Sequence, residues 1–250
     1  MLLSLIMTAQ PASQRNWNGS YRFGKDVLID MPEYGSYVAA VIAGWSLIEA
    51  QLGRTFAALI GAKQPVTMSM YSAVRSFDVQ KSLLEAAVDD RLPKRNALFF
   101  RAALTVINRA AIHRHRFAHW IWGASADPAL TGLLLVEPKN FWNVTAAQIK
   151  YWNKKGKAQL EAGSRMAFQV GLPRLAHEHI YVYELKDLKD CRKQVERALY
   201  IADELRNFAN SRSKKRREIY RLLTADDEIC TALKKAKTEK AKKTPRTNTA

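Results

Sequence analysis

The sequence predicts a mainly α-helical protein: a helical bundle with a small inserted β element and a basic C-terminal tail. Three observations support this prediction. Apolar residues recur at steps of three and four over several long segments, which is the period of amphipathic helices. A short apolar run at 131–136 is bounded by turn residues, as a strand would be. Residues 211–250 carry 13 Lys and Arg against 5 Asp and Glu, a net charge of +8 out of +17 for the chain.

The first long helix is predicted over residues 33–61. Before it, residues 1–31 show no clear period and are expected to be irregular, with loop residues at Asn16, Asn18, Gly19, Ser20 and Gly24. Pro32 opens the helical pattern, and Gly61 and Pro65 mark its end. One apolar face is expected to point into the bundle, and it consists of Val38, Val41, Trp45, Ile48, Leu52, Phe56 and Leu59.

Two further helices are expected before residue 120. A helical block at about 68–91 has a break near Ser76, whose hydroxyl could cap the second part. Pro93 is placed at the first position of the next helix, where its missing N–H costs nothing, and this helix runs to about His119. Its apolar face is Phe100, Leu104, Ile107 and Ala111, and it is expected to pack antiparallel to helix 33–61.

The pattern changes after His119. Residues 123–128 are typical of a turn, the run 131–136 of a strand, and 141–144 could pair with that strand. Thr145 is expected to cap a helix through about Leu160, and Ile180–Tyr183 could form another short strand. A last long helix is predicted over 184–209 from the apolar stripe Leu188, Cys191, Val195, Leu199, Ala202, Leu205 and Phe208.

The expected organisation therefore has three parts. An irregular segment covers 1–31, and a helical domain covers 32–210 with a β insertion at about 124–183. The basic tail covers 211–250 and is expected to be disordered from about Thr238.

Composition excludes several classes of protein. A hydrophobic fraction of 48% excludes a wholly disordered chain. Two cysteines, Cys191 and Cys230, are too few for a disulfide scaffold or the usual cysteine-based zinc sites. No stretch approaches the roughly 20 apolar residues of a membrane span. The apolar start, Met1–Met7, is short and lacks the basic region of a signal peptide, so we expect a cytoplasmic protein.

The basic tail predicts a polyanionic partner, most often a nucleic acid. Its densest run is Lys214–Arg217. Two alternatives remain open for this segment: a solvated tail that binds nothing specific, and contact with an anionic membrane surface.

Three of the five histidines fall in one heptapeptide, His113–His119, together with Arg114 and Arg116. Arginine offers a planar fork of donors to phosphoryl oxygens. Histidine titrates near neutral pH and can move a proton in either direction. Cleavage of RNA by its own 2′-hydroxyl requires these groups, because the substrate supplies the nucleophile.

A metal site is the alternative use of these histidines. His115 and His119 are four residues apart on a helix, a spacing that can hold zinc. However, the run contains no Asp or Glu, and its arginines add positive charge that disfavours a divalent cation. We therefore expect no metal and no cofactor.

The run Arg114-His-Arg-Phe-Ala-His119 resembles the R-x4-H motif of HEPN proteins (higher eukaryotes and prokaryotes nucleotide-binding), with polar His115 after the arginine. The following Trp122-Gly123 is also similar to relatives that read R-N-x-x-A-H-G, although Trp120 stands where many of them have Gly. A long helix, a middle helical block and a third helix that ends in the motif occur in the matching order. The resemblance covers roughly 33–123, and helix 184–209 would complete the bundle.

The resemblance implies a HEPN-like helical bundle that dimerises through the motif face, so that paired Arg and His form one composite cleft. Many such proteins are metal-independent endoribonucleases, often toxins or defence proteins, which leaves room for a cognate inhibitor protein. By this analogy Arg114 would hold the scissile phosphate of RNA, His119 would act as general acid or base, and His115 would assist. Other members are inactive, so a non-catalytic module that binds RNA or a partner protein is the alternative.

Helical geometry sets a condition on this site. Positions five apart are 500° around an ideal helix, or about 140° off the same face. Arg114 and His119 can therefore converge only if the helix ends or distorts between them, or if a second subunit contributes its own copies. Arg109 and His115 offer an alternative R-x5-H register. Expected contacts to the RNA backbone are Arg109, Arg116, Lys214, Lys215, Arg216 and Arg217.

Overall fold

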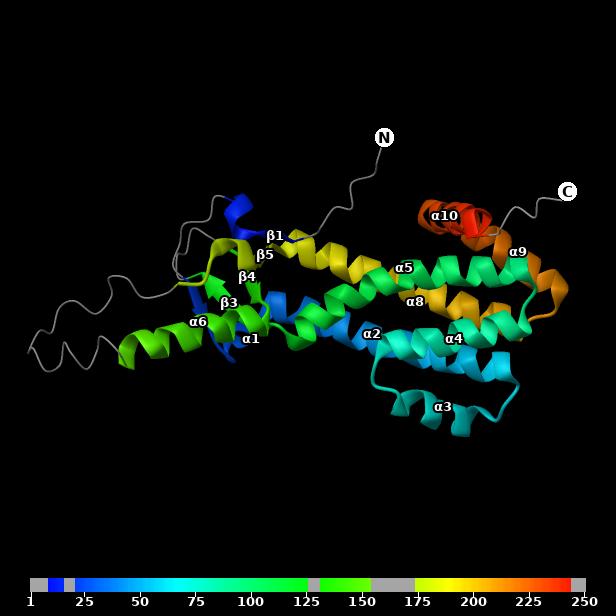
Figure 1. Cartoon of the computed structure of the whole chain (residues 1–250), viewed down its shortest axis with the longest axis horizontal. Helices are drawn as coiled ribbons and strands as arrows, with labels where there is room; N and C mark the ends of the chain where they lie inside the picture. The colour runs from blue at the N-terminus through cyan, green and yellow to red at the C-terminus, as the bar shows by residue number, and fades with distance from the viewer. Residues whose placement is uncertain (1–8, 16–20, 126–130, 154–173, 244–250) are drawn as a thin grey trace, which may run out of the picture. The chain divides into compact units, whose positions relative to one another are not determined.

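The computed structural model describes residues 9–15, 21–125, 131–153 and 174–243. These residues are mainly helical, with a small antiparallel sheet (Figure 1), and this confirms the predicted fold class at the level of a helical bundle with a small β element. The chain divides into two compact units. The sheet unit comprises residues 1–40 and 115–192, and the helical unit comprises 41–114 and 193–250.

The sheet unit contains a five-stranded sheet in the order β1-β5-β4-β3-β2, in which every pair of neighbours is antiparallel. Its strands are β1 (Gln10–Pro11), β2 (Tyr21–Phe23), β3 (Ile121–Ser125), β4 (Leu133–Val136) and β5 (Ile180–Tyr183). Strand β4 is buried along its whole length because it lies at the centre of the sheet. Helix α6 (Pro138–Tyr151) packs its Phe141 and Val144 against a core cluster that includes Leu134 and Val182. Shorter helical turns in this unit are η1 (Ala12–Arg15), α1 (Val27–Asp30) and η3 (His177–His179).

The β element is more extensive than the sequence predicts. The strands at 131–136 and 180–183 are confirmed as β4 and β5, but the expected turn at 123–125 is strand β3. Residues 1–31 are not irregular throughout, because they supply both edge strands, β1 and β2. The loop predicted at 16–20 and the turn residues 126–128 lie outside the described residues.

The assignment of 141–144 as a strand is wrong. These residues lie on α6, which begins at Pro138 and has a proline in its first turn, where no N–H is needed. Thr145 is therefore inside the helix and caps nothing, and its hydroxyl donates to the Phe141 carbonyl oxygen at 3.0 Å. The predicted continuation of this helix to Leu160 lies beyond residue 153 and outside the described residues.

Long helices supply the helical unit, and most residues of their predicted apolar faces are buried. Trp45, Ile48 and Leu52 on α2, and Phe100, Leu104 and Ile107 on α5, are at most 2% exposed. The boundaries between the two units fall within α2, α5 and α8. The helices are α2 (Pro32–Ile60), α3 (Gln64–Ala73), α4 (Phe77–Arg91), α5 (Lys94–His119), α8 (Leu185–Asn210), α9 (Ser213–Thr224) and α10 (Asp227–Lys243).

Some helix boundaries differ by a few residues from those expected. The break near Ser76 is confirmed, but the Ser76 side chain makes no capping hydrogen bond. Helix α2 ends at Ile60, as Gly61 and Pro65 predict, but α3 already begins at Gln64, with Pro65 in its first turn. Pro93 immediately precedes α5, and its carbonyl accepts hydrogen bonds from the Asn96 and Ala97 N–H groups at 2.8 and 3.0 Å.

The C-terminal segment is a folded part of the helical unit. Residues 213–224 and 227–243 form α9 and α10, so disorder from Thr238 is wrong as far as Lys243, and 244–250 lie outside the described residues. Ile219 and Leu223 on α9 and Ile229 on α10 are at most 4% exposed. In the part of the chain that the structure describes, no helix combines the length and apolar character that crossing a membrane requires.

A cluster of charged residues holds the start of α10. Arg197 on α8 donates from Nε to Asp226 Oδ2 at 3.0 Å and from Nη1 to Glu228 Oε1 at 2.7 Å. Asp226 also caps α10, because its Oδ1 accepts the N–H groups of Glu228 and Ile229 at 3.0 and 3.1 Å. Burial would raise the pKa of Asp226, but the hydrogen bonds from Arg197 and from these N–H groups lower it below its ordinary value of 3.8.

Replacing Asp226 is therefore expected to destabilise the protein in two separable steps. Asp226→Asn keeps a capping oxygen and loses the charge, whereas Asp226→Ala loses both and should cost about 1 kcal/mol more. Because the folded pKa is lowered, the ionic contribution is complete above pH 3.8 and is lost as the pH falls below it. Urea unfolding at several pH values measures both effects. If the difference in free energy of unfolding between the native chain and Asp226→Asn did not shrink in acid, the ionic contribution of Asp226 would be contradicted.

Candidate nucleic-acid site

The R-x4-H motif lies on an unbroken helix. Helix α5 continues through His119, and the Trp120 N–H still donates to the Arg116 carbonyl at 2.9 Å. The helix therefore neither ends nor distorts between Arg114 and His119, and the helical period keeps these two residues about 140° apart. Of the two ways in which they could converge, only a contribution from a second subunit remains.

His115 and His119 lie together on one face of α5. They are one turn apart, both side chains are exposed, and their ring centroids are 5.0 Å apart with the planes tilted by 52°. This spacing follows from the helix, because residues at i and i+4 are neighbours on its surface. Among the described residues, no group of three or more His, Cys, Asp and Glu side chains is arranged to hold a metal ion. The pair can instead supply two imidazoles to one substrate.

Arg116 is engaged by the sheet unit. Its guanidinium carbon lies 4.7 Å from the ring centroid of Tyr181 and 5.0 Å from that of Trp120. Its Nη1 donates to the Tyr183 hydroxyl at 3.3 Å. Burial raises the pKa of Tyr183 to about 12 although Arg116 lowers it, so this hydroxyl stays protonated at neutral pH. Arg116 thus holds the Trp120 and Tyr181 rings and the Tyr183 hydroxyl, and its contact to RNA stays a prediction.

Trp120, which follows His119 in the sequence, and Tyr181 form an aromatic pair, with centroids 5.4 Å apart in an edge-to-face arrangement. Both side chains are half-buried. Tyr181 is not among the site residues predicted from the sequence. Alternation along β5 could have revealed it, because Tyr181 and Tyr183 are two residues apart and point to the same face of the sheet.

The third histidine of the heptapeptide has a structural role. His113 is 9% exposed, and its Nε2 lies 3.0 Å from Oε1 of Gln194, so it joins α5 to α8 within the helical unit. Arg109 is also engaged, because its Nη1 donates to Glu228 Oε2 at 2.7 Å. The alternative register Arg109–His115 therefore has an arginine that is already neutralised by a carboxylate.

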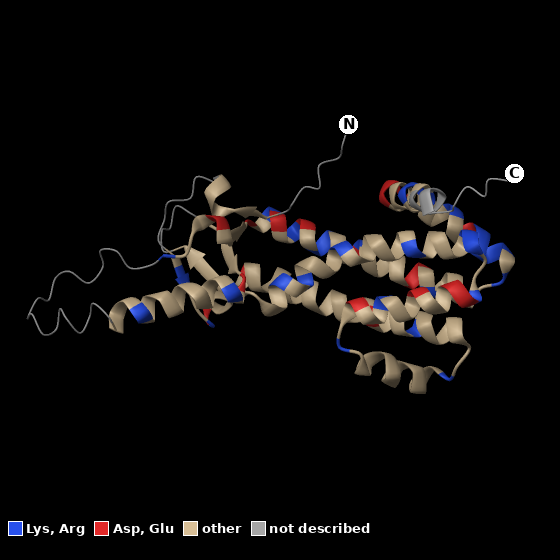
Figure 2. Cartoon of the chain, in the orientation of Figure 1, with Lys and Arg blue, Asp and Glu red and all other residues tan. Residues whose placement is uncertain are grey.

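The four residues of the basic run at 214–217 do not share one role, because one of them contacts α8 and the other three are exposed. Arg216 donates from Nε and Nη2 to the Phe208 and Ala209 carbonyl oxygens at 3.0 and 3.1 Å, and so caps the C-terminal end of α8. Lys214, Lys215 and Arg217 are exposed on α9, where Figure 2 shows Lys and Arg gathered. Arg221 is exposed as well and falls on the same stripe as Lys214 and Arg217, by helical steps of three and four. Arg221 is not among the predicted RNA contacts, although this spacing could have identified it.

Each unit therefore carries one candidate feature. The sheet unit has the exposed histidine pair at the end of α5, and the helical unit has the basic stripe on α9. No protein-family model, curated protein or solved structure matches the chain.

Proposed function

We propose that this protein is a HEPN-like, metal-independent endoribonuclease that acts as a dimer, with its active site at the end of α5. The observation that supports the proposal is the exposed pair His115 and His119, with ring centroids 5.0 Å apart, inside an R-x4-H motif. General acid–base chemistry on one substrate needs two proton-transfer groups within reach of it, and this pair meets that condition.

The reaction needs one base, one acid and one cation. One imidazole takes the proton of the ribose 2′-hydroxyl while the 2′-oxygen forms a bond to phosphorus. The other imidazole donates a proton to the 5′-oxygen as the bond from phosphorus to that oxygen breaks. The products are a 2′,3′-cyclic phosphate and a 5′-hydroxyl. An arginine fork stabilises the charge on the phosphoryl oxygens in the transition state.

A dimer supplies that arginine. Arg114 of the same chain lies about 140° around α5 from His119. A two-fold axis that places two α5 ends face to face brings the partner subunit's Arg114 toward His119, and the reverse contact forms at the same time. The composite site is therefore doubled, and each half depends on both chains.

A non-catalytic RNA-binding module is the second candidate. The exposed stripe Lys214, Arg217 and Arg221 favours it, because spaced cations on one helix face can contact successive phosphates without any chemistry. This candidate predicts binding that weakens steeply with salt and no RNA product under any condition.

Cleavage of single-stranded RNA in excess EDTA tests the proposal. The purified full chain is expected to release products with 2′,3′-cyclic phosphate ends, and His119→Ala should lower the rate by about 10²- to 10⁴-fold, the usual contribution of a general acid or base. His179→Ala is the matched control, because His179 lies on η3 outside the motif, with a side chain about 45% exposed. Equal rates for His119→Ala and the native chain would reject His119 as the catalytic residue.

A further inference from the structure

Two arginines on different helices of the helical unit share one carboxylate. Arg109 on α5 donates from Nη1 to Glu228 Oε2 at 2.7 Å, and Arg197 on α8 donates from Nη1 to Glu228 Oε1 at 2.7 Å. Glu228 lies in the first turn of α10. Each oxygen of this carboxylate therefore accepts from a different guanidinium group. A phosphate group can take the same place, because guanidinium donors recognise carboxylate and phosphate oxygens alike.

Solvent reaches all three side chains of this arrangement. The side chain of Arg109 is 41% exposed, that of Arg197 35% and that of Glu228 43%. Ion pairs at this degree of exposure are screened by water and salt, and they bind their partners only weakly. An anion from solution can therefore compete with Glu228 for the two arginines.

Other contacts of α10 do not involve the Glu228 side chain. Ile229, the next residue, is fully buried at 0% exposed. Asp226 caps the helix with its Oδ1 and accepts from Arg197 Nε on its Oδ2. The Glu228 side chain can therefore turn away from the arginines while the helix stays in place. Arg109 would then lose the one ion-pair partner that the described part of the chain gives it, whereas Arg197 would keep Asp226.

The C-terminal segment places its acidic residues at these arginines. Residues 211–250 have a net charge of +8 and contain five Asp and Glu, of which three are consecutive, at 226–228. Two of these three, Asp226 and Glu228, bond to arginines of the bundle. The segment therefore neutralises arginines of α5 and α8, while its own cations on α9 stay exposed.

We propose that Arg109 and Arg197 form a binding site for one phosphate of the RNA backbone, and that Glu228 occupies this site when no RNA is bound. This inference rests on the proposed function, which supplies RNA as the substrate. When RNA binds, the Glu228 side chain turns into solvent, and two phosphoryl oxygens accept from the two guanidinium groups. A free phosphate compound shares this chemistry, so two probes are needed to separate the two sources.

The site adjoins the basic stripe on α9 along the chain. Arg221 precedes Asp226, the second partner of Arg197, by five residues. Five residues span no more than about 18 Å even when fully extended. Both features belong to the helical unit. An RNA strand on the stripe can therefore place a neighbouring phosphate between Arg109 and Arg197, which adds a backbone contact outside the catalytic pair.

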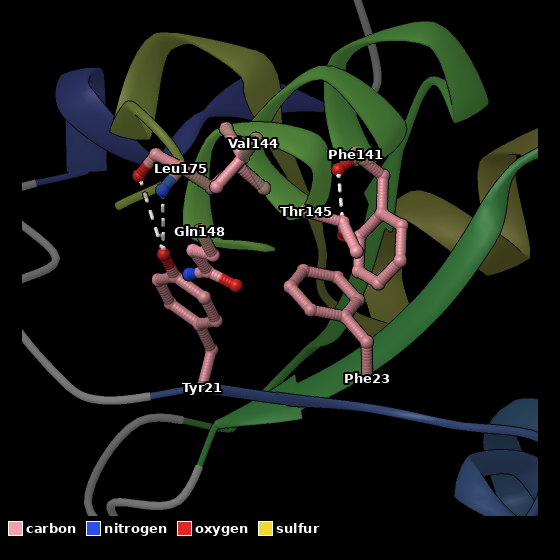
Figure 3. Close-up of a pocket in the computed structure, with 7 residues that line it drawn as sticks. All are labelled: Tyr21, Phe23, Phe141, Val144, Thr145, Gln148 and Leu175. Carbon is pink, nitrogen blue, oxygen red and sulfur yellow. Dashed lines mark hydrogen bonds between the residues drawn. The ribbon is translucent and has the colours of Figure 1, made fainter. Parts of the chain in front are cut away.

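The pocket in the sheet unit cannot bind a phosphate in this way. It lies between β2 and α6 and has a volume of about 220 Å³ (Figure 3). Its described lining residues are aromatic, aliphatic or uncharged polar, such as Phe23 and Phe141, with no Lys, Arg or His among them. The arginine pair is therefore the stronger candidate for a further contact to RNA.

Binding of an uncleavable oligonucleotide to the full chain tests the site without any requirement for catalysis. The probe is a single-stranded 2′-O-methyl RNA, which lacks the nucleophilic hydroxyl, and its affinity is measured by fluorescence anisotropy. Inorganic pyrophosphate, measured by isothermal titration calorimetry, is the second probe. The variants are Glu228→Gln, Arg109→Gln and the two combined, and thermal unfolding verifies that each is folded.

Asp227→Asn is the matched control. Asp227 is exposed in the same turn of α10, and it has no ion-pair partner in the part of the chain that the structure describes. Its substitution removes the same charge one residue away, so it matches the general electrostatic gain of Glu228→Gln. Any further gain in affinity must come from the arginines that Glu228 releases.

Glu228→Gln is expected to bind the oligonucleotide about threefold or more tightly than Asp227→Asn, because a released guanidinium gains a charge-assisted bond to phosphate. Arg109→Gln should remove most of this gain when the two changes are combined. Tighter binding of the oligonucleotide identifies RNA as the ligand. Tighter binding of pyrophosphate alone identifies a free phosphate compound and would overturn the assignment to RNA.

Equal affinity of Glu228→Gln and Asp227→Asn for both probes would overturn the site, and so would a gain that survives Arg109→Gln in full. These outcomes are separable from that of the proposed function, because His119→Ala should bind the oligonucleotide as the native chain does. A chain that cleaves RNA but shows no effect of Glu228→Gln beyond the control would refute the site and leave the nuclease standing.

Discussion

An equimolar mixture of Arg114→Ala and His119→Ala chains is expected to cleave RNA at about a quarter of the native rate, although each variant alone is nearly inactive. The reason is the unbroken geometry of α5, in which helical hydrogen bonding continues past the motif to Trp120. Arg114 and His119 of one chain therefore face different directions, and in the proposed dimer each catalytic pair comes from two chains.

The expected fraction follows from counting sites. Random exchange of subunits makes half of the dimers mixed. Each mixed dimer holds one site in which Arg114 of one chain and His119 of the other are both intact, and one site in which both are lost. Half of the dimers are mixed, and each of these keeps one of its two sites, so the mixture has about a quarter of the native activity if the two sites act independently.

Co-expressing the two variants with different tags and purifying through both tags isolates the mixed dimer, which by the same count should have about half of the native rate per dimer. The matched control pairs Arg114→Ala with a chain that carries both substitutions, because this mixed dimer has no intact site. Cleavage by the control dimer would contradict the prediction. So would a test dimer that is inactive at a concentration where the native dimer cleaves, because Arg114 and His119 would then not act together from two chains.

Local pattern predicts the long helices well because their cores are stripes on single elements. The stripe through Trp45, Ile48 and Leu52 is buried where the period places it. The edge strands β1 and β2 have two and three residues, too few for any period, and their partners β5 and β3 lie a hundred residues or more away. Nothing in the local sequence of Gln10 or Tyr21 could reveal such pairing.

The misassigned segments show what overrides local preference. The aromatic and β-branched residues at 141–144 favour a strand, but Pro138 begins a helix there, and Phe141 and Val144 are one helical step apart, facing the same core. The same limit applies to the site. The position of His115 and His119 on one face follows from helical spacing, whereas the engagement of Arg109 by Glu228 and of Arg216 by the end of α8 depends on contacts between distant helices.

Leu223→Ala is expected to destabilise the protein by about 2–5 kcal/mol, the usual cost of this truncation in a core. The C-terminal segment carries much of the basic charge, yet its apolar side belongs to the helical unit. Leu223 is 2% exposed. The Tyr220 ring, on the same helix, lies 4.9 Å from that of Phe99, which in turn lies 5.3 Å from Phe208 of α8.

The opposite face of α9 should separate folding from binding. Changing Lys214, Arg217 and Arg221 together to alanine alters only exposed side chains on a helix, so stability should change by no more than about 0.5 kcal/mol per site. The same triple variant loses up to three phosphate contacts, which lowers the slope of log affinity against log salt by about 2 for single-stranded RNA.

Urea unfolding and RNA binding across a salt series should therefore show opposite effects for the two variants. Leu223→Ala loses stability, and at temperatures where it remains folded it binds RNA with the native salt slope, whereas the triple variant keeps its stability and loses slope. Deleting 211–250 cannot make this distinction, because it removes Tyr220 and exposes the Phe99 ring together with the loss of charge. If the triple variant instead kept the native slope, the charge on α9 would not be contacting RNA, and the basic surface that binds the substrate would have to lie elsewhere on the chain.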